Sequence, residues 1–296
     1  PGTDHAGIAT QLQVEMRLKE AGTSREEVGR NTFLEETWAW KEEHGGRIVE
    51  QIRRLGASCD WSRERFTLDD GRSRAVREAV VHLYEKGLIY RGPRLINWSP
   101  SLQTAVSDLE VEHTEENGKL YYFKYQLAED LDQFIPVATT RPETILGDTA
   151  VATHSAHELF GKLVGRTAVL PAIERHIPII TDQLVDPKFG TGAVKVTPAH
   201  DPNDYEMGLR HGLDAPTVLT DKALMNELAG PYEGMDRYDA REAIVRDFET
   251  EGLLVKIEPY HHAVAHCQRC DTIVEPRIST QWFLDVEPLE IGRASC

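Results

Sequence analysis

A change of pattern near residue 110 constrains the fold more than any other feature of this chain. Before it, apolar residues recur at helical spacing, which predicts helices over 5–22, 32–55 and 72–86. After it, short runs of β-forming residues punctuated by Pro and Gly predict strands over 120–127, 134–139, 149–153, 168–170, 177–180 and 193–197. Helical patterns return near 201–211 and 237–251. This order predicts an α/β protein in which a strand-rich module interrupts a mainly helical domain.

The domain boundaries follow from the same change. With 296 residues, the chain has room for about two domains. We expect a partial domain over 1–111, an inserted domain over 112–260, and a return to the first domain over 261–290 through a Cys/His-rich hairpin. Glu-Asn-Gly at 116–118 predicts a turn before the first strand of the insertion. Residues 291–296 are expected to be a non-native tail, because the closing EIGRASC resembles a translated sequencing adapter.

Composition and charge restrict the classes of protein to consider. Hydrophobic residues make up 40% of the chain, as expected for a folded globular protein rather than a disordered one. No run of about 18 apolar residues occurs, so no membrane span is expected. The formal net charge of −16 argues against nucleic acid as a general partner, although one basic patch can hold RNA on an acidic protein.

The cysteines bear on compartment and on metal binding. They are few, and Cys267 and Cys270 form a C-x-x-C, which is typical of a reducing, cytoplasmic protein rather than a disulfide scaffold. A structural zinc site needs four ligands. His261, His262 and His266 lie close enough in sequence to complete one, but we favour a metal-free hairpin.

Two polar segments stand out within the strand-rich module. One is ATTRPETILGD at 138–148, and the other is GTGAVKVTPAHDPNDYE at 190–206. Threonines, charges and prolines replace the Val and Ile of a buried strand, which predicts a pocket for a small, polar, charged ligand. Simpler interpretations exist for single residues. An Asp-x-x-Asp such as Asp201 and Asp204 is usually an N-cap pair, and Lys195 between two valines can point outward from a strand.

Several longer strings resemble one family. PGTDHAGIATQ at 1–11, GASCDWSRERFTLDD at 56–70 and NWSPSLQTAVSDLEVE at 97–112 look like valyl-tRNA synthetases, as do both polar segments and EPRISTQWF at 275–283. The resemblance implies part of a class I, Rossmann-type catalytic domain with an inserted, β-barrel-like editing domain called connective peptide 1. The chain is therefore expected to be an internal fragment of such an enzyme.

The resemblance also implies what this chain should not do. Class I synthetases activate amino acids with HIGH-type and KMSKS-type motifs, whose groups stabilise the phosphate transition state electrostatically. Neither motif occurs in the sequence. We therefore expect ATP-dependent valine activation, with its ATP and Mg²⁺, only in a full-length enzyme. Asp4 resembles the family residue that binds the substrate α-ammonium in the synthetic site, although an acid at a helix N-terminus is an equally good interpretation.

Hydrolytic editing is the activity that the resemblance leaves to this chain. A hydrophobic pocket cannot strongly reject an isostere with one added hydroxyl, and valyl-tRNA synthetase facing threonine is itself a standard example of this limit. A second site must then hydrolyse threonyl-tRNA. We expect water to hydrolyse mischarged Thr-tRNA(Val) without cofactor, metal or covalent intermediate. The expected partners of this monomeric, cytoplasmic protein are the tRNA(Val) acceptor end and its threonine or valine moiety.

Roles for single residues follow from the matching family positions. Asp204 matches the acid that pairs with the substrate α-ammonium, and Asp201 could orient the water or bind the substrate hydroxyl. Lys195 and Arg141 match charged positions suited to the adenosine phosphate or a developing oxyanion. The remaining candidates are hydroxyls for substrate or water and a ring for the terminal adenine: Thr140, Thr197, the neighbouring Thr139, and Phe189. His200 is expected to pack or cap rather than act as a base.

Two alternatives stay open. An isoleucyl-type fragment would edit Val-tRNA(Ile), although SDLEVE and the segment 195–197 favour the valyl type. A non-catalytic fragment would hold the tRNA acceptor end without turning it over.

Overall fold

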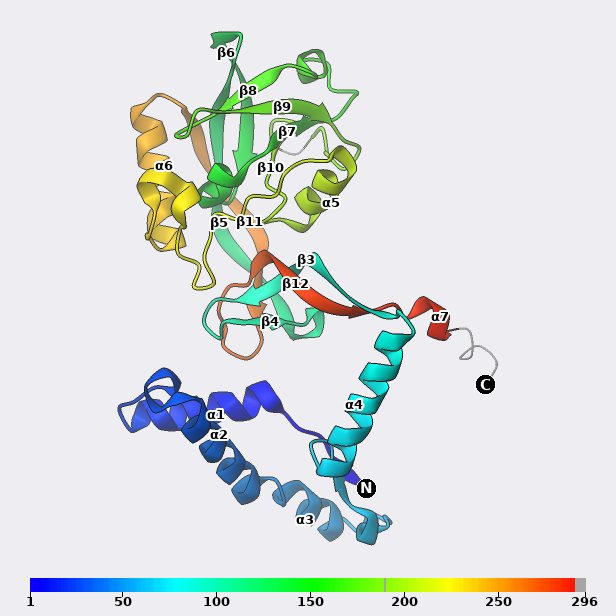
Figure 1. Ribbon diagram of the computed structural model, residues 1–296. Helices are drawn as coiled ribbons and strands as arrows, with labels where there is room; N and C mark the ends of the chain where they lie inside the picture. Colours follow the sequence, from blue (N-terminus) through cyan, green and yellow to red (C-terminus); the bar gives the residue numbers. More distant parts are fainter. Residues whose placement is uncertain (189, 291–296) are drawn as a thin grey trace. The chain divides into compact units, whose positions relative to one another are not determined.

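The computed structural model describes residues 1–188 and 190–290, in two compact units (Figure 1). One unit contains Pro1–Arg91 and the C-terminal residues from Trp282, and the other contains Gly92–Gln281. Both boundaries between the units fall inside strands rather than loops. No helix in the described ranges is long and apolar enough to cross a membrane.

The smaller unit is mainly helical, as its sequence predicts. Its elements are β1 (Gly2–Thr3), α1 (Gly7–Glu20), α2 (Arg25–His44), α3 (Arg47–Arg54), β2 (Arg65–Phe66), α4 (Asp70–Glu85) and α7 (Glu287–Glu290). Ser24 and Glu27 form a capping box that starts α2. The helix expected over 32–55 is interrupted after His44, where Gly45 and Gly46 separate α2 from α3, because glycine is a poor helix former.

The larger unit is built on a seven-stranded sheet with the order β10-β7-β9-β8-β5-β11, in which β6 also pairs with β5. The strands are β5 (Val111–Leu127), β6 (Asp130–Thr139), β7 (Ala150–Thr153), β8 (Thr167–Leu170), β9 (Arg175–Thr181), β10 (Ala193–Val196) and β11 (Leu254–Cys267). All six strands expected between 120 and 197 are present. The α/β class with a large multi-stranded sheet is thereby confirmed.

A second, three-stranded sheet has the order β12-β3-β4. Its strands are β3 (Ile89–Ser99), β4 (Thr104–Val106) and β12 (Glu275–Leu284). Strands β3 and β12 each continue across the boundary between the units. They carry the chain into the larger unit and out of it again.

The turn expected at 116–118 is wrong. Strand β5 runs straight through these residues, and Asn117 and Gly118 pair with His261 and Tyr260 of β11. A Cβ on Gly118 would lie 2.5 Å from Cε1 of His262. The glycine therefore leaves room for the imidazole ring of the neighbouring strand. In the sequence, a glycine with this role looks the same as a glycine in a turn.

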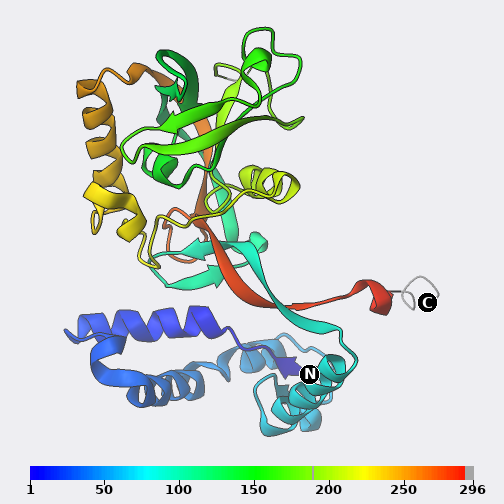
Figure 2. The same cartoon turned by 45° about the horizontal axis from the view of Figure 1, so that its top comes forward.

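The core of the larger unit lies between its sheet and α6 (Arg237–Thr250), which runs along one side of the sheet in both views (Figure 2). Phe248 of α6 meets Phe123 of β5 edge to face, with ring centroids 5.2 Å apart. A second buried cluster joins β7 and β10 to Met207 of α5 (Pro202–His211). Both helices are thus fixed against the strands that carry the polar segments.

Candidate functional site

Two segments that follow strands of the large sheet meet and form the candidate site. The 139–148 segment leaves β6 and makes a 3₁₀ turn over Pro142–Gly147. The 195–204 segment leaves β10 and enters α5. Arg141 Nη1 donates to the carbonyl of His200 at 3.1 Å, and the Thr197 hydroxyl donates to Asp148 Oδ1 at 2.5 Å. The structure therefore brings together the two polar segments that the sequence singles out.

Asp204 is a buried carboxylate on the first turn of α5, with only 8% of its surface exposed. Its Oδ2 accepts the backbone N–H of Thr197 at 2.8 Å. In the described parts of the chain it forms no ion pair. Burial raises the pKa of Asp204 to about 7; the charge of Lys195 opposes this shift and that of Asp201 adds to it. The site thus holds a desolvated carboxylate whose charge is only partly compensated.

Asp201 is the N-cap of α5. Its Oδ1 accepts the backbone N–H groups of Asn203 at 2.8 Å and Asp204 at 3.1 Å. Asp201 is therefore an N-cap, as the Asp-x-x-Asp spacing alone indicates. One of its carboxylate oxygens caps the helix that carries Asp204. Its contact with a water or a substrate hydroxyl stays a prediction.

Lys195 points into the protein, with 8% of its surface exposed, so the outward-facing interpretation is wrong. Its Nζ donates to Asp148 Oδ1 at 3.4 Å and to the hydroxyl of Thr197. Asp148 is fully buried and also accepts the Tyr125 hydroxyl, at 2.6 Å. Burial raises the pKa of Asp148, and the charge of Lys195 opposes that shift. A hydrogen-bonded cluster of four side chains therefore sits beside Asp204.

Sequence reasoning missed Asp148 and Tyr125. Asp148 closes the 138–148 string and stands between the apolar pairs Ile145-Leu146 and Ala150-Val151, which is a signal for a buried, paired charge. Tyr125 carries no such signal, because an aromatic residue is ordinary in a strand. Only the sheet register places its hydroxyl next to Asp148.

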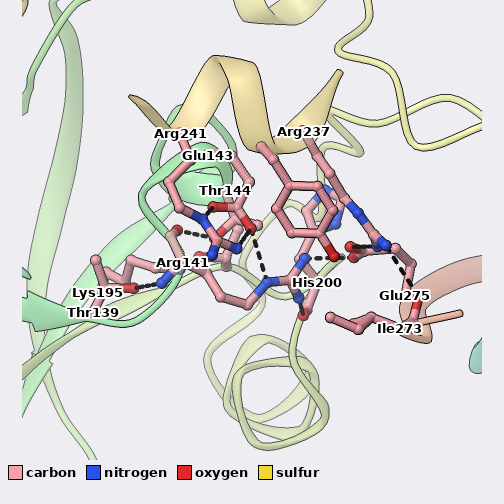
Figure 3. A network of polar contacts seen from close by, with 12 residues as sticks. Thr139, Arg141, Glu143, Thr144, Lys195, His200, Arg237, Arg241, Ile273 and Glu275 are labelled. Atoms are coloured by element: carbon pink, nitrogen blue, oxygen red, sulfur yellow. Dashed lines mark hydrogen bonds and ion pairs between the residues drawn. The ribbon is translucent and has the colours of Figure 1, made fainter. Parts of the chain in front are cut away.

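Arg141 lies between two carboxylates. Its Nε donates to Glu143 Oε1 at 3.2 Å, and its Nη2 donates to Glu275 (Figure 3). Arg241 of α6 binds both oxygens of Glu143, at 2.8 and 2.9 Å, and Arg237 binds the other oxygen of Glu275. Burial alone would raise the pKa of Glu143, but the hydrogen bonds of Arg241 and the charge of Arg141 lower it to about 2. These five residues form an ionic network next to the site, in which both carboxylates are buried.

His200 is buried and neutral. Its Nε2 accepts the backbone N–H of Val218 at 3.0 Å, and burial, with the nearby charges of Arg141 and Lys195, lowers its pKa to about 3. Its Nδ1 is buried and has no hydrogen-bond partner within the described ranges. The ring contributes packing and one hydrogen bond to the loop before Val218.

The other predicted residues are placed as follows. Thr139 is buried and accepts the backbone N–H of Arg141 at 3.0 Å, and Thr140 beside it is half-buried. Phe189 lies outside the described residues. Asp4 belongs to the other unit, where 85% of its side chain is exposed and one oxygen lies 3.7 Å from His5 Nδ1. It lines a cavity of about 750 Å³ in that unit.

The C-x-x-C turn belongs to a separate, smaller hydrophobic cluster. Cys267 is buried with Val106 and Val274, and Cys270 Sγ lies 3.4 Å from the Ser99 hydroxyl. Across residues 1–188 and 190–290, no group of three or more His, Cys, Asp or Glu side chains is arranged to hold a metal ion.

Asp204 should make the stability of the protein fall with rising pH. Its pKa is about 7 in the folded chain against an ordinary 3.8, so its contribution is complete below pH 3.8 and is lost as pH rises through about 7. Asp204→Asn cannot ionise, so the variant should gain stability relative to wild type over this range and level off above it. Urea unfolding at several pH values between about 4 and 8 measures the difference, and parallel curves would show that Asp204 ionises normally.

Residues 1–293 match the family of class I tRNA synthetases (I, L, M and V), and the chain belongs to this family. Among curated proteins, it is 59% identical over 98% of its length to the valine–tRNA ligase of Carboxydothermus hydrogenoformans, and 58% identical over 98% to that of Thermotoga maritima. The match covers 33% of each of these relatives, so the chain spans about a third of their length. The resemblance to valyl-tRNA synthetases is confirmed.

A solved structure titled as a ternary LeuRS–tRNA–LeuAMS complex from Agrobacterium radiobacter K84 is similar at a TM-score of 0.39 and 17% identity, over 95% of this chain and 45% of that one. A score this low is too weak for a detailed comparison of folds.

Proposed function

We propose that the larger unit is an editing domain that hydrolyses the ester bond of mischarged Thr-tRNA(Val). The observation that carries this proposal is Asp204, a buried and oriented carboxylate that forms no ion pair with any residue the structure describes. The α-ammonium of an aminoacyl ester is the cation that would complete it. A substrate ammonium would supply the positive charge that the buried carboxylate lacks. A hydrogen bond between charged groups is about twice as strong as one between neutral groups.

Lys195 is suited to stabilise the negative charge that develops on the ester carbonyl oxygen. An ammonium has three N–H donors, and Asp148 and Thr197 take two of them. The third donor is left for a substrate oxygen. Because Thr197 donates its own hydrogen to Asp148, its hydroxyl can only accept further bonds. Asp148 therefore orients both groups, as a pre-organised electrostatic site requires.

The reaction is a hydrolysis in which all atoms balance. Water attacks the carbonyl carbon, the bond to the terminal ribose oxygen breaks, and a water proton goes to that oxygen. Threonine leaves as a carboxylate, the second water proton is released to solvent, and the tRNA keeps a free ribose hydroxyl. The step uses no ATP, Mg²⁺ or other cofactor, and Asp201 and Thr140 are the residues we assign to the water and the substrate hydroxyl.

Sheet closure supports a barrel-like shape for the domain. Thr191, just before β10 at one edge of the sheet, donates to the carbonyl of Pro136 at 2.6 Å, and Pro136 lies in β6, which pairs with β5. We expect Phe189, two positions before Thr191 in the sequence, to stack on the terminal adenine. Within this proposal the partner is the tRNA(Val) acceptor end, and the protein acts as a cytoplasmic monomer. Valine activation is not proposed for this chain, because both motifs for it are missing from the sequence.

The test is deacylation by this chain of three substrates side by side. Thr-tRNA(Val) should lose its amino acid well above the uncatalysed rate, while Val-tRNA(Val) should stay close to it. Preferential hydrolysis of Val-tRNA(Ile) would instead identify an isoleucyl-type editing fragment. If the chain binds the acceptor end but no ester is lost above background, it is a non-catalytic RNA-binding fragment and the enzymatic proposal is refuted.

A further inference from the structure

Glu275 occupies an unusual place in the larger unit. It is the first residue of β12, the strand that leads out of this unit, and only 5% of its surface is exposed. One carboxylate oxygen accepts from Arg141 and the other from Arg237 (Figure 3). Arg237 also donates to the carbonyl of Ile273 at 3.3 Å. A single side chain of the exit strand thus holds a candidate site residue and the first residue of α6.

The contacts of Arg141 show what Glu275 can do for the site. Each of its three nitrogens donates to a protein acceptor, in Glu143, His200 and Glu275. Because every nitrogen of Arg141 already donates to the protein, its guanidinium is committed to these contacts. Its bond to the His200 carbonyl is a tie between the 139–148 and 195–204 segments. Because the guanidinium is planar, Arg141 keeps its bond to the His200 carbonyl only if acceptors also fix its other two nitrogens.

We propose that Glu275 is a positioning residue for the editing site: it fixes the Arg141 guanidinium that joins the two segments, and so makes hydrolysis depend on the placement of strand β12. Glu275 lies outside both polar segments. Its expected effect on hydrolysis rests on the proposed function. Asp204 is held separately, by the Thr197 N–H and by α5. Loss of Glu275 should therefore affect the chemical step more than substrate binding.

The first experiment compares wild type with Glu275→Gln. We expect kcat for Thr-tRNA(Val) hydrolysis to fall by about 10-fold to 10²-fold, because small displacements of catalytic groups are costly, while KM stays within about twofold. Hydrogen exchange should become faster in the peptides that contain 139–148 and 197–204. Glu258→Gln is the matched control, since that carboxylate lies on β11 and bonds Tyr122 and Lys256 rather than Arg141 or Arg237. It should change neither readout.

A second variant separates positioning from plain stability, because Glu275→Gln leaves the buried Arg237 and the half-buried Arg141 without their shared carboxylate. Glu275→Gln/Arg237→Met also removes one of those cations, so its melting temperature should recover while kcat stays low. Recovery of kcat together with stability would overturn the inference, as would unchanged exchange in both segments. If wild type itself hydrolyses nothing, faster exchange in Glu275→Gln still supports the positioning role, and only the proposed function fails.

Discussion

Asp204→Asn should reduce kcat/KM for Thr-tRNA(Val) hydrolysis by about 10²-fold or more. Truncating one partner of a buried, hydrogen-bonded charge pair costs about 2–5 kcal/mol, and each 1.4 kcal/mol is about tenfold. The asparagine oxygen can still accept the Thr197 N–H, so the start of α5 should keep its geometry. The measurement is the rate of threonine release from Thr-tRNA(Val) at several substrate concentrations.

The control for this variant is Asp214→Asn, which makes the same change of charge at an exposed residue beyond α5. It should leave the rate unchanged. An ester without the α-ammonium gives a second comparison, because wild type and Asp204→Asn should hydrolyse it equally slowly. Full activity of Asp204→Asn on Thr-tRNA(Val) would mean that Asp204 does not bind the ammonium.

Local patterns were enough to predict six of the seven strands of the large sheet, but not β11. Pro and Gly punctuate the β-forming residues, and six short strands were predicted from that pattern. The same logic failed at Asn117-Gly118, where the glycine accommodates His262 from a strand far away in sequence. Strand pairing decides that case, and a single local window contains no information about the partner strand.

Prediction of the site was limited in the same way, because a local window of sequence does not show which distant residues come into contact. The two polar segments were found because they break the pattern of a buried strand, and the structure brings them together. Glu275 could not be assigned from sequence, since its partner Arg141 is 134 residues away and its own surroundings read as the start of an ordinary strand. The capping role of Asp201 was readable locally, because an N-cap bonds residues only two and three positions ahead.

Lys195→Met should cause the largest loss of stability among substitutions in the site, about 3–5 kcal/mol in the free energy of unfolding. The change leaves Asp148 fully buried, with hydroxyl donors but no cation. Methionine fits the space of the aliphatic stem, so lost packing contributes little. Urea unfolding of wild type and variant at neutral pH measures the difference.

The double variant Lys195→Met/Asp148→Asn tests whether the lost charge balance is the cause. Asparagine can accept the Tyr125 and Thr197 hydroxyls without a charge, so much of the stability should return, although hydrolysis should not, because the donor for the substrate oxygen is gone. The loss in Lys195→Met alone should also shrink at low pH. Burial already raises the pKa of Asp148, and without Lys195 that pKa rises further, so acid neutralises the unpaired carboxylate. A destabilisation that is independent of pH and persists in the double variant would show that Lys195 acts through packing rather than charge.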